Sequence, residues 1–121
     1  MAERRRAARV TSRIREELAS TLRREIRDPR LASVLVTRVE APDDLQLATV
    51  YVRLEIGSDD PASRKAALQG LKAATGRLRR SLAGSLGLRY TPDLRFVYDS
   101  GVEAESRVEE LLHEIKRERG E

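Results

Sequence analysis

The stretch LKAATGRLRRSLAG, residues 71–84, combines the apolar spacing of a helix with a residue that helices disfavour. Leu71, Leu78 and Leu82 stay on one helical face, and the same phase extends over about 61–86. Gly76 interrupts this pattern, and a glycine inside a helix costs about 1 kcal/mol relative to alanine. We therefore predict a helix that bends or splits at Gly76, where a Cβ would clash or strain, while both halves pack on one core.

The segments on either side predict two more helices and three strands. Apolar residues at every fourth position predict a helix over about 6–27, ended by the Asp-Pro pair that follows it. Alternating patterns predict strands within 33–41 and 46–56, joined as an antiparallel hairpin, and a third strand over 94–99. An acidic amphipathic segment predicts a last helix over about 102–119. Together these elements form one α+β domain over residues 1–121, with its core in about 6–99 and its helices on one side of the sheet.

The composition excludes several classes of function. The chain has no cysteine and a single histidine, His113, so we expect neither a disulfide, a metal site nor a cofactor. No apolar run is long enough to span a membrane, and the basic N-terminus lacks the apolar segment of a signal peptide. We therefore expect a cytoplasmic protein with no membrane partner.

The charges are segregated along the chain, although the net charge is only +4. The window from Arg64 to Pro92 contains no acidic residue, and a second basic segment lies in the first thirty residues. Such segregation predicts a polyanionic partner, because arginine matches phosphate groups well. The basic residues that we expect to contact it are Lys65, Lys72, Arg77, Arg79 and Arg80 in the window and Arg5, Arg9 and Arg13, spaced along one face of the first helix.

Four motifs in this order resemble the ribosome-binding factor A family, whose members assist assembly of the small ribosomal subunit. They are the Asp28-Pro29-Arg30 turn after the first helix, the hairpin sequence VTRVEAPDDLQLATVYV, the Ala74-Thr75-Gly76 kink and the strand sequence TPDLRFVYD. The resemblance implies a single type II KH-like domain of order α-β-β-α-kink-α-β, with an extra C-terminal helix in this chain. In the family an Ala-x-Gly kink replaces the GXXG loop with which KH domains hold the nucleic-acid backbone.

The resemblance also implies a function and a binding site. It implies a small-subunit maturation factor that binds free 30S subunits and 16S rRNA, supports late processing of the rRNA 5′ end and growth in the cold, and is not an enzyme. The rRNA-binding residues would then include Ala74, Thr75 and Gly76, where a helix break would offer amide groups to phosphate. We expect the free protein to be a monomer.

Three alternatives stay open from the residues alone. The chain could be a general RNA-binding KH module, or a protein-binding adaptor that uses the hairpin edge or the acidic last helix. An RNA-directed hydrolase is disfavoured, because no acids, histidines or thiols are grouped as a catalytic set.

Overall fold

A computed structural model describes residues 2–101 and confirms an α+β architecture of two helices and a three-stranded sheet. The elements are, in chain order, α1 Ala2–Arg24, the 3₁₀ helix η1 Pro29–Leu31, β1 Val34–Glu40, β2 Leu47–Leu54, α2 Pro61–Leu86 and β3 Asp93–Tyr98. The predicted strands lie where the sequence placed them, whereas η1 was not predicted. The predicted helix over 102–119, and His113 within it, lie outside the described residues.

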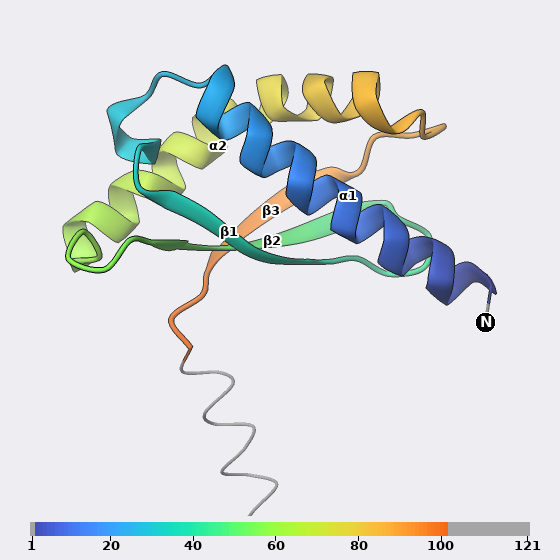
Figure 1. The fold of residues 1–121 in the computed structure, drawn as a ribbon, viewed down its shortest axis with the longest axis horizontal. Coiled ribbons are helices and arrows are strands. Elements are labelled where there is room, and N and C mark those ends of the chain that lie inside the picture. Colours follow the sequence, from blue (N-terminus) through green and yellow to red (C-terminus); the bar gives the residue numbers. More distant parts are fainter. Residues whose placement is uncertain (1, 102–121) are drawn as a thin grey trace, which may run out of the picture.

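The sheet has the order β1-β2-β3, with β1 antiparallel to β2 and β2 parallel to β3. Both helices cover the same face of this sheet (Figure 1). The central strand shows why: Ala48, Val50 and Val52 are at most 1% exposed, and they alternate with more exposed residues. Because alternate side chains of a strand point to opposite faces, one face of β2 forms the floor of the core.

The link between α1 and β1 is held by a short capped turn. The helix ends at Arg24, three residues before the predicted end, and Asp28 then caps η1 by accepting the backbone N–H of Arg30. The Arg30 guanidinium also lies 2.6 Å from the Asp28 carboxylate, and these hydrogen bonds lower the pKa of Asp28. The turn places Leu31 in the core at 4% exposure, where it packs against α2.

The long helix α2 is continuous, so of the predicted bend or split at Gly76 the split is wrong. Its 26 residues lie between the Asp60 cap and Gly87, whose left-handed backbone (φ 60°) ends the helix. Figure 1 shows the axis of α2 changing direction near the middle. A physical cause lies beside Gly76: the Thr75 hydroxyl donates to the Leu71 carbonyl at 3.0 Å, and such bonds bend helices.

The predicted clash at Gly76 is also wrong. A Cβ built on Gly76 meets no atom within 4 Å, so the glycine is not required for packing inside the chain. The closely packed glycine of α2 is Gly70, where a Cβ would lie 3.0 Å from Leu31 Cδ2 and 3.3 Å from Asp28 Oδ2. The prediction that both halves of the helix share one core is confirmed, since Leu71 and Leu78 are both fully buried.

Candidate nucleic-acid interface

The exposed side of α2 carries basic residues without acidic neighbours on the helix. Lys65, Lys72, Arg77 and Arg80 are exposed, and among residues 2–101 none of them forms an ion pair. We call these four residues the α2 basic face. These residues belong to a helix whose apolar side is buried in the core, so their charged side chains are on the outer side of α2. Such a surface can neutralise several phosphates of one nucleic-acid backbone.

Arg79 differs from the other basic residues of α2. Its guanidinium donates to the carbonyls of Pro92 at 3.1 Å and Thr91 at 3.0 Å, and it lies 3.5 Å from the Asp93 carboxylate. Since Pro92 is fully buried, these bonds fix the connection that leads into β3. The side chain therefore has a structural role, and its predicted contact with rRNA stays a prediction.

The Ala74-Thr75-Gly76 segment offers less to a ligand than the sequence suggested. Ala74 is half-buried against the core, and the Thr75 hydroxyl is occupied by the Leu71 carbonyl. Because α2 continues through Gly76, the amide groups there belong to the helix ladder and form no new helix start. Only Gly76 is exposed, and its bare backbone leaves room for a close approach from outside.

The structure brings part of the α1 basic segment to the end of α2. Arg13 donates from Nη2 to the carbonyl of Ser85 at 3.2 Å, in the last turn of α2, where a cation is favoured by the helix dipole. One turn earlier, the Thr21 and Ser81 hydroxyls are 2.7 Å apart, and Ser81 donates to Glu17. Two basic segments that are far apart in the sequence thus meet through these contacts.

Arg5 and Arg9 are exposed on α1, and both precede Arg13 at four-residue intervals. At this spacing side chains lie on adjacent turns of one helix face. Arg5, Arg9 and Arg13 therefore lie along one face of α1, as their spacing predicts, and the contact with Ser85 places Arg13 beside the end of α2.

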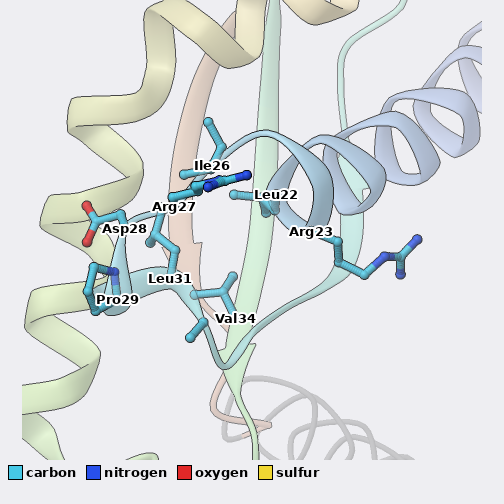
Figure 2. A pocket seen from close by; sticks show the side chains of 9 residues that line it. Leu22, Arg23, Ile26, Arg27, Asp28, Pro29, Leu31 and Val34 are labelled. Atoms are coloured by element: carbon cyan, nitrogen blue, oxygen red, sulfur yellow. The ribbon is translucent and has the colours of Figure 1, made fainter.

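Sequence reasoning missed a hollow of about 420 Å³ where α1 passes into β1. Its lining combines apolar and basic side chains: Leu22, Arg23, Ile26, Arg27, Asp28, Pro29, Leu31, Ala32 and Val34. In Figure 2 the Arg23 guanidinium points away from the other labelled side chains that line the hollow. No local sequence pattern could have identified this hollow, because the turn after α1 creates it.

With this geometry in view, comparison with known proteins identifies the family. The model of the family described as Ribosome-binding factor A matches residues 6–112. The chain belongs to the ribosome-binding factor A family. A ribosome-binding factor A from Sorangium cellulosum is 60% identical over 111 residues, which cover 92% of this chain and 89% of that protein.

Known structures described as ribosome-binding factor A have a similar fold. A putative ribosome-binding factor A from Thermotoga maritima is 35% identical, with a TM-score of 0.67, over 79% of this chain and 89% of that one. A Thermus thermophilus homology model is 28% identical, with a TM-score of 0.59, over 72% of this chain and 88% of that one. That model was fitted into a cryo-electron microscopy map of a complex of 30S with RbfA.

Within residues 2–101 no three histidine, cysteine or acidic side chains are grouped to hold a metal ion. In the same range, neither helix has an apolar stretch sufficient to cross a lipid bilayer. The exposed cations of the α2 basic face are the candidate interface.

Proposed function

We propose that this protein is an assembly factor that binds the free 30S subunit through 16S rRNA and catalyses no reaction. The observation that carries the proposal is the α2 basic face, in which exposed cations lie on one rigid helix without acidic neighbours. The family membership and the Thermus complex with 30S support the same partner.

The proposed mode of binding is recognition of the rRNA backbone and shape. The chain has only three tyrosines and one phenylalanine, and Phe96 packs against the core. A base-stacking platform needs several exposed aromatic side chains, which this chain lacks. Its basic side chains would therefore bind the phosphate groups of the rRNA backbone. Lys72, Arg77 and Arg80 would make these contacts, while the open surface at Gly76 would let the rRNA backbone approach α2.

The finer parts of the function follow from the family resemblance. We propose a type II KH-like fold, a cytoplasmic location, a monomeric free state, support of late 16S rRNA 5′-end processing and a contribution to growth in the cold. Arg5, Arg9 and Arg13 would extend the interface along α1, because Arg13 is joined to the end of α2.

Co-sedimentation with purified 30S subunits at increasing salt concentration tests the proposal. If six or more phosphate contacts form, affinity should fall by several orders of magnitude between about 50 and about 200 mM salt. Affinity that does not respond to salt would contradict backbone recognition. Equal binding to unrelated structured RNA would instead favour a general RNA-binding module.

Charge reversal locates the contacts. The variant with Arg77→Glu and Arg80→Glu should lose at least about tenfold in affinity, and its salt slope should decrease by about two. Arg23→Glu with Arg24→Glu changes the net charge equally, on exposed positions of α1 outside the proposed interface. This control should bind more tightly than the α2 variant, with little change in slope. Equal losses in the two variants would show that total charge, and not the α2 basic face, determines binding.

A further inference from the structure

The face of the sheet opposite the helices is uncovered among residues 2–101. The strand register places Leu35 beside Arg53, Arg38 beside Tyr51, and Tyr51 beside Val97 on this side. Leu35, the second residue of β1, is a large apolar side chain that is 39% exposed. In Figure 1 both helices lie on the other side of the sheet. An apolar patch within a charged border is typical of an interaction surface.

This open face also carries ordered cationic groups. The Arg38 guanidinium lies 4.0 Å from the centre of the Tyr51 ring, and the Tyr51 hydroxyl donates to Glu40 at 3.2 Å. Arg53 and Arg95 are also exposed on this face, Arg95 beside Thr49 and Arg53 four residues further along β2. The surface therefore fits a partner segment that combines apolar and acidic residues.

Asp99, the residue that follows β3, is hydrogen-bonded to both other strands of the sheet. The Asp99 backbone N–H donates to the Val52 carbonyl at 2.6 Å, and its carboxylate accepts the Thr37 hydroxyl at 2.8 Å. Since Thr37 belongs to β1, this carboxylate reaches from the end of β3 past β2 to the far strand. The Thr37 bond lowers the pKa of Asp99, and the charges of Arg38 and Arg53 contribute, so Asp99 lies near the basic residues of the open face.

Residues 102–121 begin at this point and have matching chemistry. They include seven acidic and four basic residues, and their apolar positions follow the spacing of one helix face: Val108, Leu111, Leu112 and Ile115. A helix of the length predicted for 102–119 would be about 27 Å long. A strand of the length of β2 also spans about 27 Å, so the segment and the sheet have similar lengths.

We propose that the acidic segment 102–121 docks on the open face of the sheet in the same molecule. Its apolar residues contact Leu35, Tyr51 and Val97, and its glutamates pair with Arg53 and Arg95. The sheet is then covered on both faces, and the α2 basic face stays free for RNA. The proposal does not depend on ribosome binding.

A spin label tests this docking in the full-length chain, which has no native cysteine. His113→Cys, a polar position beside the apolar stripe, would carry the label, and amide resonances would be recorded by NMR. We expect the Tyr51 and Val97 signals to lose half or more of their intensity, while the Arg80 signal on α2 stays unchanged. Uniform intensities, or losses confined to α2, would overturn the proposal.

Charge reversal and mixing experiments complete the test. Arg53→Glu with Arg95→Glu should restore the Tyr51 and Val97 signals, whereas the matched control Arg23→Glu with Arg24→Glu should not. The amide spectrum of each variant verifies that it is folded. Mixing unobserved protein that carries the spin label with isotopically labelled protein that carries no spin label detects contacts between molecules. If the losses occur equally in that mixture, the face binds a second copy and intramolecular docking is wrong.

Discussion

The two halves of α2 share one core but face different surroundings. In the first half, Gly70 lies against the side chain of Leu31, and a Cβ there would be 3.0 Å from Leu31 Cδ2. In the second half, Gly76 has no atom within 4 Å of the position that a Cβ would occupy. Two glycines in one helix therefore serve different purposes: the first permits close packing inside the protein, and the second leaves an open surface. The following predictions test this difference.

The largest effect should come from the leucines that both halves contribute to the core. Leu71 and Leu78 are fully buried, so Leu71→Ala and Leu78→Ala should each reduce the free energy of unfolding by about 2–5 kcal/mol. Urea denaturation measures this loss. Ile56→Ala serves as the control, because Ile56 is 96% exposed and should change stability little. A small loss at only one of the two leucines would show that the halves do not share the core equally.

A smaller loss is expected from Gly70→Ala. The added methyl group would press on Leu31, which is 4% exposed and has little room to move, so we expect destabilisation by about 1–3 kcal/mol. A double-mutant cycle with Leu31→Ala isolates the contact, because the penalty at Gly70 should largely vanish in that background. A Gly70→Ala protein as stable as the original would mean that the turn at η1 adjusts freely.

The opposite sign is expected for Gly76→Ala. Alanine has the higher helix propensity and meets no neighbour, so stability should rise by up to about 1 kcal/mol. Affinity for 30S subunits should nevertheless fall, since the new methyl group stands where we propose that rRNA approaches. Gly84→Ala is the matched control: it is also helical and open, and should stabilise the protein without weakening binding. Unchanged affinity in both variants would remove Gly76 from the proposed interface.

The smallest effect concerns the cap of the first half of α2. Hydrogen bonds from the Ser63 side chain and backbone lower the pKa of Asp60 below its ordinary value. The ionised carboxylate therefore stabilises the native state above its ordinary pKa, and this contribution is lost as pH falls through the lowered pKa. Thermal unfolding between about pH 5 and about pH 2 should show a stability difference between the original protein and Asp60→Ala that narrows with acidity. If the stability difference between the two proteins stays constant with pH, the cap does not depend on ionisation of Asp60.

Local periodicity in the sequence was sufficient to predict most of the secondary structure. The spacing of Leu71, Leu78 and Leu82 indicated the buried face of α2, and the alternation of Ala48, Val50 and Val52 indicated the buried face of β2. Both patterns follow from the number of residues per turn or per pleat, which is a property of the backbone. The motifs along the chain likewise indicated the family, which the comparisons confirm.

Only the tertiary structure decided which residues meet across the fold. It showed that the closely packed glycine is Gly70 and not Gly76, that Arg79 holds the connection to β3, and that Arg13 reaches the end of α2. Glycine and arginine have the same local propensities whether they are packed or exposed, so the sequence pattern could not distinguish these roles. Their partners lie on other elements of the fold, and these contacts form only when the helices pack on the sheet.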